Sequence, residues 1–190
     1  MKTTRLVLAI FALLVLNGPS FAQTGLRLGT PGYGGTGCPG GTAAVSLSAD
    51  GTLSLRFTRY QVSVGGGSSR TFDRKSCSLA IPVHVPAGKR VSIVAVEVRG
   101  KNSLSASAKT QLNVESFISG GRGPRLTQTF TGPRSGPFVA PMRVGSANWS
   151  SCGADVTLRS NSSLRVSSTK GRLASASSAS IIYRLQWRNC

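Results

Sequence analysis

The sequence predicts an all-β fold, a single disulfide-stapled β-sandwich or barrel-like domain. Three observations predict it. No segment repeats its apolar residues with the 3.6-residue period of a capped helix, whereas many short runs alternate between apolar and polar residues. Turn residues separate these runs at short intervals, as in sandwiches and barrels. The four cysteines form an even set that suits cross-linking.

Residues 1–22 have the layout of a secretory signal peptide. Lys2 and Arg5 precede an apolar stretch of 11 residues at 6–16, and a small-x-small cleavage site follows. The apolar stretch is shorter than the about 20 residues that a spanning helix needs. We therefore expect a secreted β-domain at 23–190 without a transmembrane segment, located outside the cell or in a periplasm.

The first third of the expected domain contains a loop and then a hairpin. Residues 23–41 are rich in glycine and have no periodicity, which predicts a loop. Residues 43–48 and 52–58 alternate on either side of an Asp-Gly turn, the usual signal of a β-hairpin. Residues 60–64 form a further short strand, which ends at three consecutive glycines.

The middle of the chain predicts one central strand and several others. Residues 79–86 alternate but contain two prolines, which favours an edge strand. Residues 90–99 are apolar on both faces, which favours a central strand covered on both sides. Strands are also predicted at 105–118 and 126–131, and a loop is predicted at 132–146 because of its three prolines.

The last part of the chain predicts a second hairpin and a closing strand. The hairpin consists of residues 156–159 and 164–167, with a polar turn between them. Small residues, many of them serine, predict a connection at 171–180. Residues 181–188 alternate again and form the closing strand.

All four cysteines lie in the expected mature chain and predict two disulfides: Cys38, Cys77, Cys152 and Cys190. Their successive separations of 39, 75 and 38 residues do not suit zinc, which uses closely spaced ligand pairs. An unpaired thiol for catalysis is not expected from an even number. Spacing alone leaves three pairings open.

A similarity between two parts of the chain favours one pairing. Residues 45–55 and 156–166 align without a gap, and each stretch lies between two cysteines. One interpretation is two similar units, each with a cysteine, a hairpin and a closing cysteine; the other is that any two hairpins look alike. If the repeat is real, the natural pairing is Cys38–Cys77 and Cys152–Cys190.

The charge balance is strongly positive. The whole chain has 23 basic and 5 acidic residues, and removal of the signal peptide leaves 21 basic residues, a balance of +16. Such a field attracts polyanions, although scattered charge also serves solubility. Five arginines fall at outward positions of the predicted strands and are candidate polyanion-binding residues on one sheet face: Arg56, Arg159, Arg165, Arg184 and Arg188.

Five short motifs resemble, in their order, the secreted family labelled domain of unknown function 4360. They are GCPGG at 37–41, RKSC at 74–77, FTGP at 130–133, WSSCG at 149–153 and LQWRNC at 185–190. The resemblance covers nearly all of the expected mature chain. It implies a secreted β-rich domain and supplies no activity.

Catalytic signals are weak. The GxGxxG pattern at 32–37 lacks the preceding strand and following helix of a dinucleotide site. His84 is the only histidine and has no nucleophile motif to serve. Glu97 and Glu115 could face each other, but a contact of Glu97 with Arg99 or with Lys109 is the more ordinary expectation. We therefore predict no catalytic, cofactor-binding or metal-binding residues and no enzyme.

The sequence favours a secreted, non-catalytic binding or structural module for an anionic polymer or an envelope surface. Two alternatives remain open. One is a secreted hydrolase with an unrecognised site, and the other is a secreted effector or inhibitor that acts on a protein target.

Overall fold

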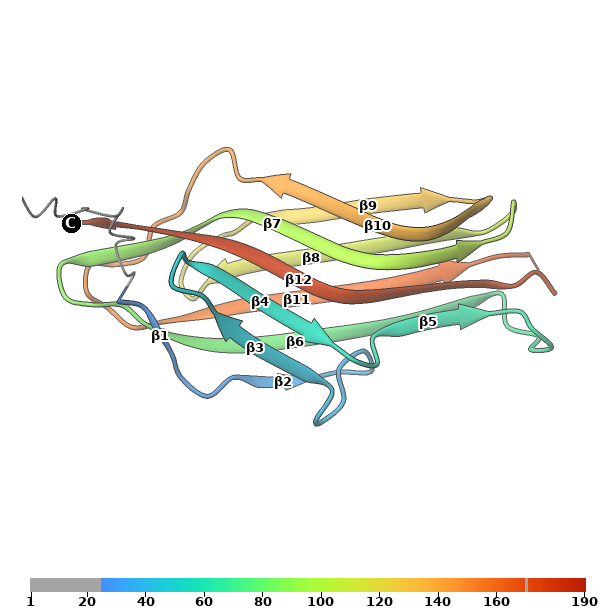
Figure 1. Cartoon of the computed structure of the whole chain (residues 1–190), viewed down its shortest axis with the longest axis horizontal. Coiled ribbons are helices and arrows are strands. Elements are labelled where there is room, and N and C mark those ends of the chain that lie inside the picture. The colour runs from blue at the N-terminus through green and yellow to red at the C-terminus, as the bar shows by residue number, and fades with distance from the viewer. Residues whose placement is uncertain (1–24, 170) are drawn as a thin grey trace, which may run out of the picture.

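The protein is a sandwich of two antiparallel sheets with twelve strands (Figure 1). The computed structural model describes residues 25–169 and 171–190, so the predicted signal peptide lies outside the described residues. Within these ranges no helix is present, and therefore none that could cross a membrane. The predicted all-β, sandwich-like fold is confirmed.

One sheet, called sheet A, has the order β1-β6-β11-β8-β9, and β2 pairs with the same edge of β6 as β1. Its strands are β1 (Arg27–Leu28), β2 (Gly32–Gly34), β6 (Phe72–His84), β8 (Lys109–Ile118), β9 (Arg125–Thr131) and β11 (Val156–Ser167).

The other sheet, called sheet B, has the order β10-β7-β12-β4-β3, and β5 also pairs with β12. Its strands are β3 (Ala43–Leu47), β4 (Thr52–Phe57), β5 (Gln61–Val64), β7 (Lys89–Leu104), β10 (Arg134–Arg143) and β12 (Ala174–Asn189). The core lies between the sheets, because the inward residues of each strand are buried and the outward ones face solvent.

The predicted first hairpin and the predicted central strand are confirmed. Strands β3 and β4 pair around the turn that contains Gly51. Strand β7 lies between β10 and β12. The expectation that both faces of β7 are covered is wrong, since Arg99 and Lys101 are exposed on its outer face. Apolar residues occur on both sides of its first half because a register shift against β12 near Val94 interrupts the alternation.

The prediction that residues 79–86 form an edge strand is wrong. Strand β6 pairs with β11 on one side and with the short strands β1 and β2 on the other. Gly29 N donates to Pro82 O at 2.9 Å, in the gap between β1 and β2. In an antiparallel sheet, the N–H and C=O groups of one residue point to the same neighbouring strand. The nitrogen of Pro82 therefore faces the same gap as its carbonyl oxygen, and no N–H donor is needed there. The same two short strands correct the prediction that 23–41 is entirely loop.

The predicted loop at 132–146 is wrong for most of its length. Residues 134–143 form β10, an edge strand that pairs only with β7. Pro137 and Pro141 lie at equivalent outward positions, four residues apart. An edge strand tolerates proline because alternate N–H groups there face away from its single partner.

The predicted second hairpin is also wrong, and with it the interpretation of two similar units. Residues 156–167 form one continuous strand, β11, which pairs with β6 along its whole length and with β8 from Leu158 to Ser167. The serine-rich residues 174–180, predicted as a connection, form the first half of β12. The pairing that the repeat favoured is nevertheless present, because Cys38 bonds to Cys77 and Cys152 to Cys190.

Two buried tyrosines join the sheets across the core. Tyr183 of β12 contacts the hydroxyls of Ser116 and Ser160 in sheet A, and Ser116 Oγ donates to the tyrosine oxygen at 2.8 Å. Tyr60, just before β5, donates to Ser162 Oγ of β11 at 3.2 Å. Burial raises the pKa of each tyrosine to about 12. The small serines therefore give each ring both space and a polar partner.

Replacement of Tyr183 by phenylalanine is expected to lower the free energy of unfolding by about 1–3 kcal/mol, because two buried serine hydroxyls lose their partner. Urea unfolding of Y183F and of the parent protein measures the difference. The triple variant Y183F/S116A/S160A should recover part of the loss. An unchanged stability of Y183F would contradict this role.

Stability is expected to fall as the pH rises from 10 towards 12. The folded protein keeps both tyrosine protons up to a pKa of about 12, whereas unfolded tyrosine releases its proton near pH 10. The folded state thus binds more protons in this window, so rising pH favours unfolding. Urea midpoints across this range measure the slope, and Y183F should show a smaller one. A slope that Y183F leaves unchanged would contradict the assignment.

Candidate polyanion-binding face

The structure divides the five candidate arginines between the two outer faces of the sandwich. Arg159 and Arg165 are on β11 in sheet A, whereas Arg56 is on β4 and Arg184 and Arg188 are on β12 in sheet B. All five are exposed. The expectation that they share one sheet face is wrong. The sequence showed that each points outward, but not which sheet its strand joins.

Two of the three arginines on sheet B already have partners. Arg184 Nη1 lies 2.9 Å from Asp50 Oδ2. The pKa of Asp50 is lowered, mainly by hydrogen bonds from the backbone and hydroxyl of Thr52 and then by Arg184. The Arg188 guanidinium lies 4.1 Å from the centre of the Trp149 ring. Of the three, only Arg56 has no ion or ring partner among the described residues.

Sheet A carries a pair of arginines without a counter-charge. Arg165 of β11 lies directly opposite Arg74 of β6 in the register of the sheet, and both point outward. Neither forms an ion pair with any residue that the structure describes. Like charges directly opposite each other in a sheet are unfavourable. The arrangement therefore costs stability unless an anion lies between the two guanidinium groups.

Amides and hydroxyls lie beside this pair on the outer face of sheet A. A shallow hollow of about 420 Å³ follows β6, β11 and β8, and it begins beside Arg74. We call this surface the sheet A face. Its polar side chains are Arg74, Ser76, Ser78, Asn113, Glu115, Arg125, Asn161 and Ser163 within the hollow, with Gln111, Arg159 and Arg165 beside it.

The one carboxylate on this face is already neutralised. Arg125 Nη2 lies 2.6 Å from Glu115 Oε1, and this hydrogen bond raises the pKa of Arg125. Thr127 Oγ1 donates to Asn113 Oδ1 at 3.0 Å, which leaves that amide's nitrogen for Ser163 Oγ, 3.5 Å away. The unpaired charge on the face is thus positive and belongs to Arg74, Arg159 and Arg165.

Sequence reasoning missed Arg74. It lies in a stretch, 72–78, that was not predicted as strand, because its residues do not alternate between apolar and polar. The motif RKSC marked the position without giving it a role. Only the pairing of β6 with β11 shows that Arg74 is next to Arg165.

The acidic residues do not converge. Glu97 is on the outer face of sheet B, where its Oε1 lies 2.6 Å from Arg99 Nε, and Glu115 is on the outer face of sheet A. The expected contact of Glu97 with Arg99 is therefore present. Asp73 accepts from Ser63 N at 3.0 Å.

His84 lies beside a carboxylate at the surface. Its Nδ1 is 2.7 Å from Asp155 Oδ1, and the two side chains are 57% and 69% exposed. The same oxygen of Asp155 accepts from Val85 N at 3.2 Å. Across the described residues, no three His, Cys, Asp or Glu side chains group as metal ligands.

The glycine pattern at 32–37 has a structural explanation. A Cβ on Gly35 would lie 2.3 Å from Ser76 O, and one on Gly37 would lie 2.4 Å from the Tyr60 ring. Gly37 N donates to Ser76 O at 2.8 Å. These glycines allow the chain to lie against β6 beside the Cys38–Cys77 disulfide.

A family model matches residues 25–190, and its description is domain of unknown function 4360. The chain belongs to this family. A relative from the fungus Arthroderma benhamiae, an "Uncharacterized secreted protein", is 30% identical over 169 residues, which cover 83% of this chain and 69% of the relative. Together with the two disulfides, this relative supports the prediction that the protein is secreted.

Two solved structures are distantly similar. TmCBM61, in complex with β-1,4-galactotriose, has a TM-score of 0.32 and 15% identity, over 82% of this chain and 92% of that one. The enzymatically active domain of tailspike protein 4 from bacteriophage CBA120 has a TM-score of 0.24 and 11% identity, over 84% of this chain and 19% of that one. At these TM-scores neither likeness supports an inference about this chain.

Replacement of Arg165 by glutamate is expected to stabilise the fold by about 0.2–1 kcal/mol, because a like-charged pair with Arg74 becomes an opposite-charged one. Urea unfolding at low salt measures the change. Arg159→Glu is the matched control, since Arg159 lies opposite Ala80 and Phe117 and gains no partner. Equal stabilisation by both variants would show that only the net charge matters.

Proposed function

We propose that the protein is a secreted, non-catalytic binding module that holds an anionic polymer on its sheet A face. The observation that carries the proposal is the Arg74–Arg165 pair, two directly opposed cations without a carboxylate. A bound sulfate, phosphate or carboxylate group would accept hydrogen bonds from both guanidinium groups. The pair would then contribute binding energy instead of repulsion.

The shape of the face favours an extended ligand. The hollow follows three neighbouring strands, with Arg74 at one part and the Arg125–Glu115 pair at another. Arg159 lies on the same outward face of β11, three outward positions from Arg165. A polymer with several anionic groups could contact these arginines together, and each contact would release counterions.

The polar groups between the arginines favour a hydroxyl-rich polyanion, such as an acidic polysaccharide. Asn113, Asn161 and Gln111 supply amides that can both donate and accept hydrogen bonds. Ser76 and Ser163 lie opposite each other and add hydroxyls. A phosphate backbone would use the arginines alone, so nucleic acid is the competing ligand in the experiment below.

A non-catalytic role agrees with the positions of the acidic residues. Glu97 and Glu115 are on opposite outer faces, so they do not flank one substrate as a pair of glycosidase carboxylates does. Each of the five carboxylates already accepts a hydrogen bond from another residue: Asp50, Asp73, Glu97, Glu115 and Asp155.

Salt elution from heparin-agarose and from DNA-cellulose tests the proposal. The mature protein should be retained at low salt, more strongly on heparin, and Arg74→Ser/Arg165→Ser should elute much earlier. We expect that the slope of log affinity against log salt decreases by about two for the double variant.

The matched control is Arg56→Ser/Arg143→Ser, which removes the same charge from exposed positions of sheet B. It should elute close to the parent protein. An equal shift for both double variants would indicate a uniform charge coat. Failure of the parent protein to bind heparin would refute the proposal, and stronger retention on DNA would replace the polysaccharide by nucleic acid.

A further inference from the structure

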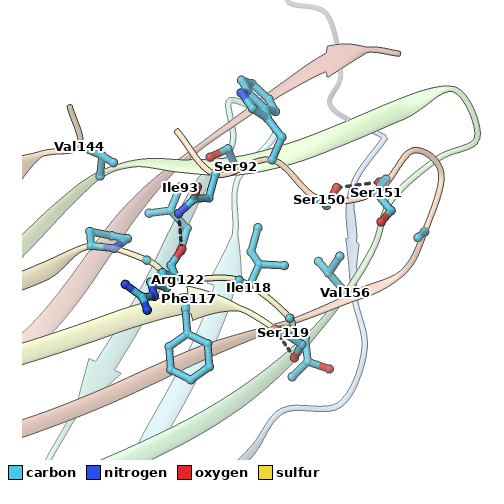
Figure 2. A pocket seen from close by; sticks show the side chains of 18 of the residues that line it. Ser92, Ile93, Phe117, Ile118, Ser119, Arg122, Val144, Ser150, Ser151 and Val156 are labelled. Atoms are coloured by element: carbon cyan, nitrogen blue, oxygen red, sulfur yellow. Dashed lines mark hydrogen bonds between the residues drawn. The ribbon is translucent and has the colours of Figure 1, made fainter. Parts of the chain in front are cut away.

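The sandwich has a second hollow, at one of its ends, that is distinct from the sheet A face. It is a cleft of about 500 Å³ between β7 of sheet B and strands β8 and β11 of sheet A. The β8–β9 loop, 119–124, and the β10–β11 loop, 144–155, complete its walls (Figure 2). Its volume lies within the range of about 300–1,000 Å³ that small-ligand sites occupy.

The β8–β9 loop is held in one shape. Ser119 N and Oγ both donate to Thr157 O, at 2.9 and 3.0 Å. A Cβ on Gly123 would lie 1.7 Å from Ser116 O, so only glycine allows this close approach. Asn148 of the opposite loop donates from Nδ2 to Arg122 O and so connects the two loops across the cleft.

The β10–β11 loop is fixed equally well. Val144 N donates to Val94 O at 3.0 Å, and Ser150 N donates to Val91 O at 2.9 Å. Val91 N in turn donates to Ser150 Oγ at 3.0 Å. The Cys152–Cys190 disulfide connects the loop to the end of β12. The cleft is therefore formed before any ligand arrives, which lowers the cost of binding.

The lining combines apolar walls with a polar border. Figure 2 shows the side chains of Ile93, Ile118 and Val156 around the middle of the cleft. Hydroxyl and amide groups come from Ser119, Ser146, Asn148, Ser151 and Thr157, and Trp149 adds an indole. Such a mixture fits a ligand with apolar faces and hydroxyls at its edges, which is the chemistry of a sugar ring.

The charge of the cleft differs from that of the sheet A face. Its lining contains one cation, Arg122, and one carboxylate, Asp155, which is held by His84. The positive excess of the outer faces is thus missing here. A polyanion gains little from such a site, whereas a neutral ligand does not need more charge.

We propose that this end cleft binds a neutral sugar unit of an oligosaccharide, with the hydroxyl and amide groups of its polar border as hydrogen-bonding partners of the sugar hydroxyls. The assignment does not depend on the sheet A face, since the two sites have different linings and different charge. It predicts a second binding activity that is insensitive to salt.

Calorimetric titration of the mature protein tests the assignment, with neutral trisaccharides of glucose, galactose, mannose, xylose and N-acetylglucosamine as probes. At least one should bind with one-to-one stoichiometry and a Kd at or below about 1 mM. The Kd should stay the same between about 50 and 200 mM salt, in contrast to heparin binding. Lack of binding by every probe at about 10 mM would overturn the assignment.

Two variants locate the site. Ser151→Ala should raise the Kd about three- to tenfold without lowering the melting temperature, because it removes an exposed hydroxyl at the border of the cleft. Ser146→Trp, at an exposed position of the lining, should block the cleft and abolish binding. Unchanged sugar binding by both variants would overturn the assignment.

The double variant Arg74→Ser/Arg165→Ser distinguishes this inference from the proposed function. It should lose heparin retention and keep the sugar affinity, while Ser151→Ala should do the opposite. A reduced sugar affinity in the arginine variant, with a normal melting temperature, would show that both ligands share one site and would refute a separate end cleft.

Discussion

Two tyrosine hydroxyls that cross the core fix how the two sheets face each other. Tyr183 extends from sheet B to Ser116 and Ser160 in sheet A, and Tyr60 extends to Ser162. Hydrophobic contact alone is non-directional and would tolerate a sliding of one sheet over the other. A buried hydroxyl tolerates it poorly, because a lost hydrogen bond inside the core is expensive. The tyrosines thus select one alignment.

This alignment explains the composition of β11. A strand with sheet neighbours on both sides normally carries large apolar residues inward, yet β11 presents Ser160 and Ser162 to the core. Large side chains there would occupy the space of the tyrosine rings. Ser162 Oγ also donates to Cys77 O at 3.3 Å, next to the Cys38–Cys77 disulfide. Ser162 therefore connects the Tyr60 hydroxyl to strand β6 at the residue that forms the Cys38–Cys77 disulfide.

A two-layer sandwich also determines where the charge goes. The core between the sheets accepts tyrosine and aliphatic side chains, so the arginines of the strands project outward from both sheets. Part of that charge is compensated on both outer faces: Asp50, Glu97 and Trp149 engage cations on sheet B, and Glu115 does so on sheet A. Arg56 and Arg143 of sheet B have no carboxylate partner among the described residues either. The direct opposition of Arg74 and Arg165, with neither an ion pair nor a ring contact in the part of the chain that the structure describes, distinguishes the sheet A face.

Local patterns in the sequence predicted the features that local chemistry decides. The alternation around Gly51 predicted the first hairpin, and the apolar run at 90–99 predicted the position of β7 in the middle of a sheet. The predictions failed where distant partners decide. Residues 156–167 look like a hairpin with a polar turn until Tyr60 and Tyr183 are placed opposite their serines. Prolines in β10 look like a loop until the strand is found at an edge.

The candidate site shows the same division between features that local sequence decides and features that distant strands decide. Outward arginines could be recognised from alternation within a single strand, and all five are exposed. Their distribution over two faces and the pairing of Arg165 with Arg74 depend on strand order, which alternation does not encode. The end cleft was not predicted either, because its lining comes from segments that are far apart in the chain and meet only in the folded sandwich.

The strand order of sheet B has a consequence for how the chain folds. Strands β4 and β5 have no neighbour on their inner side except β12, and β12 also completes the pairing of β7 (Figure 1). The β3–β4 hairpin, which is near the start of the chain, can therefore join the rest of sheet B only when β12, the last strand, is in place. Pairing over such long sequence distances is intrinsically slow and leaves strand edges open meanwhile. An exported chain with this topology would benefit from remaining unfolded until all of it has crossed the membrane.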